Sequence, residues 1–475
     1  MRGTLADDTI LIAITMPTAV HPQFERLQNS GKERRSACPR ADQALCKLDP
    51  RRDIVAMIRQ TSAGRVPKLV PLRYERMKVS PFTFFRGMAL IQAADLASAP
   101  DSGLKLQICG DAHLMNYGFF ASPERQLMFD INDFDETHHG PWEWDVKRLA
   151  VSLVLAARER GFNESAAKSV VAHMVATYRK RVNEFAQMGQ LATWYSKLGY
   201  EQLLERATDD AIRQQLVKVA DKARTQTQER LLPKMTTQED GSLRLRDNPP
   251  VIFHMTPDDQ VWGQDADWLG EGHANDLLKP MLSSYINTLK EDRRTLLQRF
   301  RPVDAAFKVV GVGSVGTRCL VVLLQDDYDQ PLFLQLKEAR NSVLEPYTQL
   351  CVHGHQGKRV VFGQRLMQAA SDLFLGWTTG PGQRHFYVRQ LRDMKGSPAL
   401  ESFETADSLA AFGQACAWAL ARAHAKSGGQ AAELAGYIGQ SDRLDQAIAA
   451  YAPLYADQVT QDYNTFCKAL KSRSL

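Results

Sequence analysis

A glycine-rich loop at Gly311–Gly316 restricts the fold of this chain more than any other feature of its sequence. The pattern G-x-G-x-x-G alone is weak evidence, but a loop of this kind that binds a dinucleotide should lead into a helix. The residues that follow it, 317–324, are instead apolar and β-branched, and residues 307–310 before it are also β-rich. We therefore expect the loop to join two strands, which excludes a dinucleotide-binding βαβ unit at this position.

A third strand is expected after this pair, and it ends in a lysine. An acidic turn at Asp326–Asp329 leads into the apolar run 331–336, which is followed by Lys337. A lysine at a strand end is commonly just solvated, but the glycine loop upstream favours a role in holding phosphate groups. The predicted nucleotide-binding residues are Gly311, Gly313, Ser314, Gly316 and Lys337.

Two earlier segments place carboxylates and an amide at the ends of short strands. The apolar run 104–108 leads to Asp111 and Asn116, and the run 126–131 leads into an acidic segment over Asp130–Asp135. Phosphoryl transfer needs a carboxylate near the attacking hydroxyl and oxygen ligands for Mg²⁺ on the phosphates. Asp, Asn and Gly also favour plain turns. Because both segments follow an apolar strand, we favour a Mg²⁺-phosphate site over two unrelated turns.

These segments resemble those of a known class of enzymes. Residues 110–116 look like the H-G-D-x-H-x-x-N catalytic loop of aminoglycoside phosphotransferases and choline kinases, and residues 132–134 look like their I-D-F metal-binding segment. The roles that this resemblance implies are catalytic base for Asp111 and metal ligand for Asn116 and Asp133, with Asp130 and Asp135 as competing registers for the metal.

The same resemblance places two supporting residues behind the catalytic loop. Residues 141–146 are similar to the P-x-x-x-D-L segment of these enzymes, whose aspartate braces the loop through backbone amides, so Asp145 would take this part. The alternative for Asp145 is an acid favoured by the dipole at the start of a helix. His113 is expected to support the loop from within its motif. Cys109 departs from these enzymes, which usually have a mainly structural histidine there.

The two halves of the predicted site come in the reverse of the usual order. Ordinary kinases place the glycine loop and the lysine first, whereas here Asp111 precedes Gly311. A circularly permuted fold explains this order, and compact domains with nearby termini tolerate such a permutation.

The chain closely resembles the bacterial domain-of-unknown-function family DUF2252, from about residue 50 to its end. An acidic residue often precedes the glycine at Gly363 in this family, whereas this chain has Phe362. That acid would be the partner of Lys337, so the acidic partner of this lysine stays open. The segments that carry the resemblance are Arg73–Phe82, Gly110–Asn116, Phe129–Thr137, Trp142–Leu149, Gly311–Gly316, Leu336–Glu338, Gly363–Trp377 and Phe386–Lys395.

The length and these motifs predict the organisation of the chain. At 475 residues it is too long for one ordinary core. We expect an α+β, helix-rich, bilobal protein-kinase-like fold in circularly permuted order. Its expected parts are a loosely ordered lead-in over residues 1–50, a catalytic and helical lobe over 51–300, a nucleotide-binding lobe with a small sheet over 301–400, and C-terminal helices over 401–475 that pack on the catalytic lobe.

The composition indicates which kinds of partner and which cell compartment to expect. A net charge of +5, from 59 basic and 54 acidic residues, is too small for this length to argue for a nucleic-acid partner. No segment approaches the roughly 20 apolar residues that a membrane-spanning helix needs. The seven cysteines lie far apart and favour reduced thiols over a disulfide framework. We expect a cytoplasmic protein without a membrane span.

The predicted reaction is transfer of the γ-phosphate of ATP to a hydroxyl acceptor with Mg²⁺ as cofactor. Two alternatives stay open: transfer of AMP by the same residues, and an inactive kinase-like protein that binds a nucleotide or another protein. The expected partners are ATP and a hydroxyl-bearing acceptor, either a small molecule or a protein, which the sequence does not identify.

Overall fold

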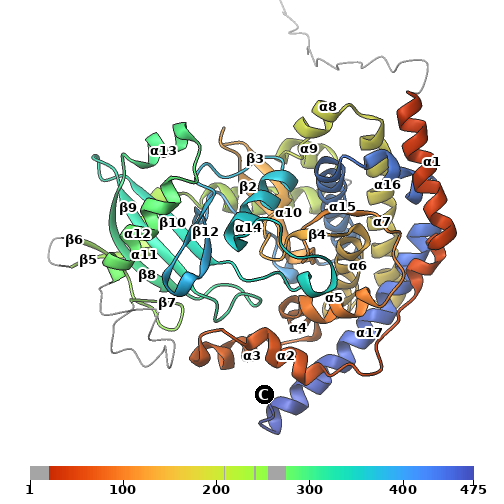
Figure 1. The fold of residues 1–475 in the computed structure, drawn as a ribbon, viewed down its shortest axis with the longest axis horizontal. Helices are drawn as coiled ribbons and strands as arrows, with labels where there is room; N and C mark the ends of the chain where they lie inside the picture. The colour runs from red at the N-terminus through yellow and green to blue at the C-terminus, as the bar shows by residue number, and fades with distance from the viewer. Residues whose placement is uncertain (1–20, 208, 240–241, 255–273) are drawn as a thin grey trace, which may run out of the picture.

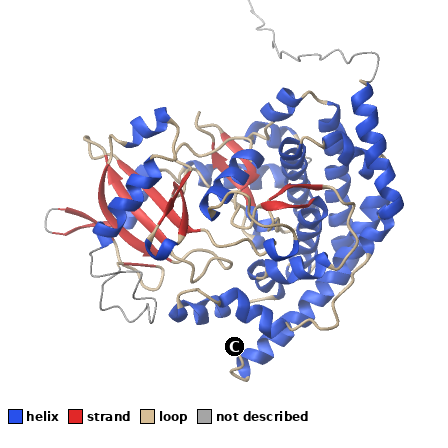
Figure 2. Cartoon of the chain, viewed as in Figure 1, coloured by secondary structure: helices blue, strands red, loops and turns tan. Residues whose placement is uncertain are grey.

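A computed structural model of the chain describes residues 21–207, 209–239, 242–254 and 274–475 (Figure 1). The expected α+β class and its high helix content are confirmed. A six-stranded sheet occupies one side of the molecule, helices fill the other, and two of the small two-stranded sheets lie between them (Figure 2).

The large sheet is antiparallel throughout and has the strand order β11-β12-β10-β9-β8-β7. Strands β9 and β10 are apolar over most of their length and are buried at every residue, so they form its centre. The glycine loop joins β8 to β9, as the sequence predicts. The strands are β7 (Ile252–Phe253), β8 (Arg301–Lys308), β9 (Cys319–Gln325), β10 (Pro331–Glu338), β11 (Gly376–Thr379) and β12 (His385–Gln390).

Several helices and one hairpin pack around this sheet. Helix α11 (Gln228–Met235) contacts β10, α12 (Ala274–Ile286) contacts β11, and α14 (Gln356–Met367) contacts β11 and β12. Elements from before residue 300 thus join this sheet: β7 pairs with β8, and α11 and α12 bury apolar side chains against it. The remaining elements here are α13 (Glu291–Leu297) and the hairpin β5 (Thr236–Glu239) and β6 (Ser242–Leu245).

The helical side is built around α6 (Trp142–Glu159), which is buried at every residue from Trp142 to Ala157. Helix α15 (Ala406–Gly428) is rich in alanine, so its backbone can lie close to that of α7 (Glu164–Gln187). The other helices of this side are α8 (Gln190–Tyr195), α9 (Tyr200–Glu205), α10 (Asp210–Arg224), α16 (Ala431–Ile438) and α17 (Arg443–Lys471).

Two short hairpin-like sheets and four helices lie where the two sides meet (Figure 1). The sequence predicts strands at β1 (Lys105–Ile108) and β3 (Leu127–Ile131), but not their partners β4 (His138–Pro141) and β2 (Tyr117–Ala121). The four helices are α2 (Ile54–Ser62), α3 (Val70–Met77), α4 (Pro81–Gly87) and α5 (Ala89–Ala97).

The sequence predicts a loosely ordered lead-in over residues 1–50, and within that range the structure has α1 (Pro22–Ala37), which packs along α16. The basic residues that suggested disorder bind the carboxyl end of α16. Arg35 Nε donates to the carbonyl of Tyr437 at 2.9 Å, and Arg40 donates to that of Ile438 at 2.8 Å. These contacts satisfy carbonyls that a helix end leaves without partners. Residues 1–20 lie outside the described part of the chain.

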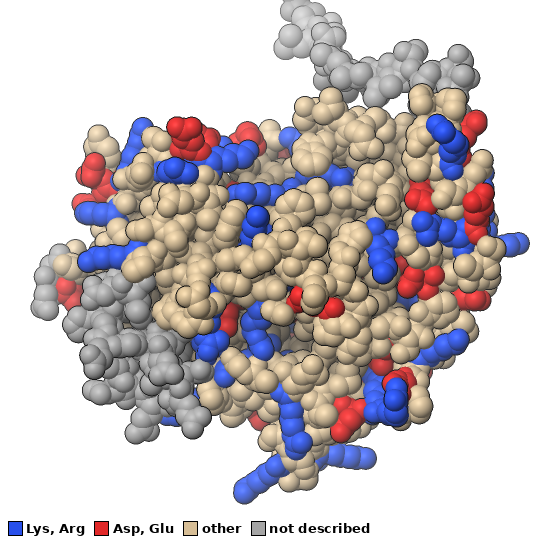
Figure 3. Space-filling model, in the orientation of Figure 1, with Lys and Arg blue, Asp and Glu red and all other residues tan. Residues whose placement is uncertain are grey.

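The helices and the surface charges bear on whether the chain could cross a membrane. None of the helices in the described ranges combines the length and apolar composition that a transmembrane span requires. On the face shown in Figure 3, Lys and Arg side chains lie interspersed with Asp and Glu, with broad uncharged areas between them.

Candidate active site

The catalytic loop predicted from the sequence follows β1 and begins with a glycine that no larger residue could replace without strain. Gly110 has φ +79°, and a Cβ there would lie 2.4 Å from the backbone oxygen of Glu136. The carboxylate of Asp145 accepts from the backbone N–H of Cys109 at 2.8 Å and from that of Gly110 at 2.9 Å. Asp145 therefore lies where the sequence places it, behind the loop, and ties the loop to the first turn of α6.

Two residues that the sequence analysis missed hold Asp145 in turn. His424 Nε2 lies 3.2 Å from Asp145 Oδ2, and the other ring nitrogen of His424 lies 2.7 Å from the hydroxyl of Tyr178. Both side chains are buried, and they come from α15 and α7. No local pattern marks them, because their positions on these helices look like ordinary core positions.

Asp111 faces the pocket and is paired on one side with Arg148 of α6. Arg148 Nε donates to Asp111 Oδ1 at 2.8 Å, and the same guanidinium donates to the carbonyl of Phe85 at 2.8 Å. Burial and the nearby charge of Asp133 raise the pKa of Asp111, and Arg148 opposes this shift. Asp111 Oδ2 lies 3.8 Å from His113 Nε2, beyond hydrogen-bond range, so Oδ2 is the oxygen able to accept a further proton.

His113 lies beside Asp111 and is buried. Burial, together with the positive charges of Arg86 and Arg148, lowers the pKa of His113 well below its ordinary value. The ring is therefore neutral near pH 7 and supports the loop without adding positive charge next to Asp111.

Asn116 and Asp133 lie on the same pocket as Asp111. The Asn116 side-chain nitrogen donates to the backbone oxygen of Asp111 at 2.7 Å, which directs the amide oxygen elsewhere. Asp133 Oδ1 accepts from the backbone N–H of Asp135 at 3.1 Å, and its side chain is 34% exposed. One carboxylate oxygen and one amide oxygen thus remain for a ligand.

Lys337 is buried at the end of β10 and meets the acidic segment of the other half. Its ammonium donates to Asp135 Oδ2 and lies 3.8 Å from Asp133 Oδ2. Burial alone would lower the pKa of Lys337, but these two carboxylates outweigh it and raise that pKa. Burial would raise the pKa of Asp135, and Lys337 and Tyr387 outweigh it and lower that pKa. Both groups are therefore charged.

Asp135 supplies the acidic partner of Lys337 that the sequence left open. Helix α14 contains no acidic residue, and instead donates from Arg359 to the backbone oxygen of Asp135 at 2.9 Å. Asp135 also accepts from Tyr387 Oη at 2.8 Å and from Ser314 Oγ of the glycine loop at 3.2 Å.

Asp130 is not brought together with the other predicted site residues. It is 1% exposed within β3, and it pairs with the guanidinium of Arg422. Its oxygens also accept from the backbone N–H of Ile131 at 2.9 Å and of Ala369 at 2.8 Å. This geometry does not support the expectation that Asp130 binds a metal, because its lone pairs are used inside the protein.

The glycine loop rests on the segment between α2 and α3. Arg65 donates to the carbonyl of Val315 at 2.6 Å, and the backbone N–H of Val66 donates to the carbonyl of Gly316 at 2.8 Å. Gly316 needs its positive φ of +84° to make this turn. A Cβ at Gly311 would meet no atom of the described residues within 4 Å, so this part of the loop faces open space.

These elements enclose a cavity of about 340 Å³. It is lined by Asp111, Asn116, Asp133, Asp135 and Glu136 on one side and by the glycine loop on the other. The basic wall between them consists of Arg65, Arg73, Arg86 and Arg340. Sequence reasoning considered Arg86 among the basic residues able to meet substrate or phosphate, and missed the other three. Only the abundance of arginine between residues 51 and 86 hinted at the wall.

The donors fit a magnesium ion that is shared with phosphate groups. No group of three or more His, Cys, Asp or Glu side chains in the described ranges is arranged to hold a metal by itself. Mg²⁺ is commonly bound by one or two carboxylates together with substrate phosphates and water. Asp133 and the amide oxygen of Asn116 supply such a partial set, and Asp135 is occupied by Lys337.

Fold and site together define a helix-rich α+β protein with a pocket of carboxylates and arginines beside a glycine loop. The chain belongs to the family described as uncharacterized proteins conserved in bacteria, DUF2252, whose model matches residues 65–469. No curated protein and no solved structure is detectably similar to it.

Proposed function

We propose that this protein is a kinase-like phosphotransferase that moves the γ-phosphate of ATP to a hydroxyl acceptor. The observation that carries the proposal is the contact between Lys337 and Asp135, which are separated by 202 residues. It joins a strand–glycine loop–strand unit to a segment with a carboxylate pair and a catalytic-loop motif. Glycine loop, buried lysine and carboxylates around one pocket are the recurring parts of phosphoryl transfer.

Each side chain has one task in the proposed reaction. Lys337 and the backbone amides of the glycine loop hold the phosphates of ATP, and Asn116 and Asp133 would hold Mg²⁺, which neutralises phosphate charge when bound. Asp111 Oδ2 accepts the proton of the acceptor hydroxyl. The acceptor oxygen bonds to the γ-phosphorus, the bond from that phosphorus to the bridging oxygen breaks, and ADP leaves.

The order of the parts supports a permuted form of the kinase-like arrangement. The glycine loop and the end of β10 follow the catalytic loop in the chain, yet Gly311–Ser314 and Glu338 line the same pocket, and Lys337 contacts Asp135 at its wall. Three antiparallel strands followed by α14 and then β11 and β12 supply the nucleotide half in the proposal.

A binding-only role is the second candidate, and one observation favours it. Asp135 draws Lys337 and Ser314 together in the pocket, and this contact must open for phosphates to reach the lysine. A protein that keeps this contact closed would not turn over ATP. Transfer of AMP from the same pocket is distinguished by the product.

The test uses purified full-length chain with ATP labelled at either the α or the γ phosphate, Mg²⁺ and a metabolite extract. γ-label alone in the product supports phosphoryl transfer, and α-label supports AMP transfer. Asp111→Asn and Asp133→Asn should each lower turnover at least 100-fold, whereas Asp327→Asn, in the exposed turn between β9 and β10, should not. Wild-type turnover in both pocket variants contradicts the proposal.

A further inference from the structure

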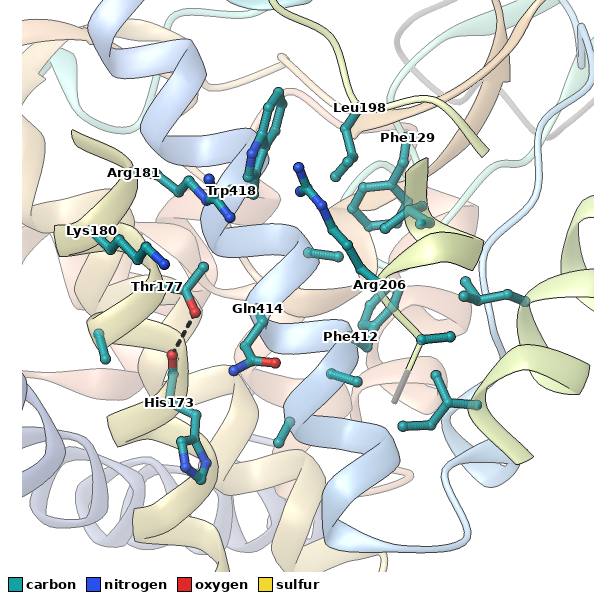
Figure 4. A pocket seen from close by; sticks show the side chains of 18 of the residues that line it. Phe129, His173, Thr177, Lys180, Arg181, Leu198, Arg206, Phe412, Gln414 and Trp418 are labelled. Atoms are coloured by element: carbon teal, nitrogen blue, oxygen red, sulfur yellow. Dashed lines mark hydrogen bonds between the residues drawn. The ribbon is translucent and has the colours of Figure 1, made fainter. Parts of the chain in front are cut away.

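A second, larger cavity of about 830 Å³ lies on the helical side of the molecule. It is enclosed by α7, α9, α10, α15 and the hairpin of β2 and β3 (Figure 4). Among the described residues, none lines both this cavity and the pocket of Asp111. Its size falls within the roughly 300–1,000 Å³ of small-molecule sites.

One wall of this cavity is apolar and aromatic. Phe129 of β3 and Phe412 of α15 pack edge to face, with ring centroids 5.5 Å apart. Leu198 lies beside them, and Trp418 lines the cavity from a later turn of α15 (Figure 4). Such a wall suits an apolar body of extended shape.

The opposite wall and the space between them carry cations. Lys180 and Arg181 project from α7, and Arg206, just after α9, reaches across toward Trp418 (Figure 4). The guanidinium carbon of Arg206 lies 5.9 Å from the centre of the Trp418 ring. Cation and indole together form a place where a charged headgroup and an apolar chain would meet.

The cations are only partly neutralised. Glu184 accepts from one nitrogen of Arg181 at 2.5 Å, but Arg181 Nε is buried without a hydrogen-bond partner in the described ranges. Burial and the charge of Arg181 lower the pKa of Arg206, and Glu184 and Glu205 oppose this. The guanidinium groups of Arg181 and Arg206 repel each other, so an anion bound between them would lower the electrostatic energy of both.

We propose that this cavity binds an amphipathic carboxylate, with its apolar chain along Phe129 and Phe412 and its headgroup between Arg181 and Arg206. The site is independent of the proposed phosphotransferase reaction. A free fatty acid and an anionic lipid in a membrane share this chemistry, and the site commits to the free acid because the aromatic wall and the cations line one cavity of about 830 Å³ and not an exposed surface patch.

The test measures binding of dodecanoate to the full-length chain by isothermal titration, below the concentration at which dodecanoate forms micelles. Dodecanol has the same chain without charge, and it should bind at least tenfold more weakly. Arg206→Gln should weaken dodecanoate binding about tenfold, because the residue is exposed and its loss spares the fold. Lys168→Gln, an exposed control on α7 outside the cavity, should bind like the wild type.

A second variant tests the apolar part. Ala411→Trp fills the cavity from α15 and should abolish dodecanoate binding while circular dichroism retains the helical signal. Equal binding of dodecanoate and dodecanol, or unchanged binding in both Arg206→Gln and Ala411→Trp, overturns the proposal. Binding to phosphatidylglycerol vesicles in place of free dodecanoate also overturns it, because the enclosed site would then not be the one used.

Discussion

Lys337 and Asp135 form a partly buried ion pair between the end of a central strand and the acidic segment after β3, 202 residues earlier in the chain. The carboxylate of Asp133 also lies near this pair, with its Oδ2 at 3.8 Å from the Lys337 ammonium. The contact closes the pocket on the side of the glycine loop, because Ser314 donates to the same oxygen of Asp135 as Lys337.

Lys337→Met should separate stability from nucleotide binding. Removing the lysine leaves Asp135 as a partly buried carboxylate without its cation, which we expect to cost about 2–4 kcal/mol in the free energy of unfolding, measured with urea. In the double variant Lys337→Met/Asp135→Asn, most of this loss should return because no charge is left unpaired. ATP binding by titration calorimetry should stay lost in both variants. A double variant that regains ATP binding would show that Lys337 does not hold phosphate.

Replacing Arg86 of the pocket should raise the stability of the fold and lower the activity. Arg86 Nε is buried with no hydrogen-bond partner in the part of the chain that the structure describes, and burial lowers the pKa of this side chain. Arg86 is partly buried, and a desolvated N–H without a hydrogen-bond partner costs stability that the nearby Phe82 ring, Asp111 and Glu159 offset only in part. Arg86→Met should therefore raise the free energy of unfolding by about 1 kcal/mol while lowering turnover at least tenfold. Loss of stability together with activity would mean that Arg86 is structural.

Local patterns sufficed for some parts of the site and failed for others. The strand, glycine loop and strand around Gly311 and the strands before Asp111 could be predicted because alternation and turn residues are local signals. The partner of Lys337, Arg148 on Asp111 and His424 behind Asp145 could not be, because each depends on packing between distant segments. The expectation that Asp130 binds a metal is unsupported for a different reason: a shift of one residue along a strand moves a side chain to the opposite face of the sheet.

Gly110→Ala tests how tightly the catalytic loop is built, with Gly161 as a matched control. Both glycines have positive φ, +79° and +76°, but a Cβ at Gly110 would lie 2.4 Å from a backbone oxygen, whereas one at Gly161 meets no atom of the described residues within 4 Å. Both variants bear the cost of the left-handed backbone, roughly 1–2 kcal/mol. Gly110→Ala should lose at least about 1 kcal/mol more, because its backbone neighbour must move. Equal losses in urea unfolding would contradict this account of the loop.

Glu143 gives a prediction on stability and pH. It is 1% exposed, accepts from the backbone N–H of Ser102 at 2.8 Å, and has a second carboxylate oxygen without a hydrogen-bond partner in the described ranges. Burial raises the pKa of Glu143 from 4.5 to about 7 in the folded chain. The folded state therefore binds this proton more tightly than the unfolded state, so stability is lost as pH rises from about 4.5 through 7.

Glu143→Gln keeps the shape and the acceptor for Ser102 but cannot ionise. Relative to the wild type, it should gain stability on the order of 1–3 kcal/mol between pH 5 and pH 8, because only the wild type must bury a carboxylate at the higher pH. Burial lowers the pKa of Lys147, one turn along α6, to about 8, and the charge of Glu143 opposes this shift, so the same comparison is repeated in a Lys147→Met background, where this coupling is absent. Urea unfolding of both proteins at pH 5 and pH 8 measures this. A difference that is the same at both pH values would show that Glu143 is not the group that titrates.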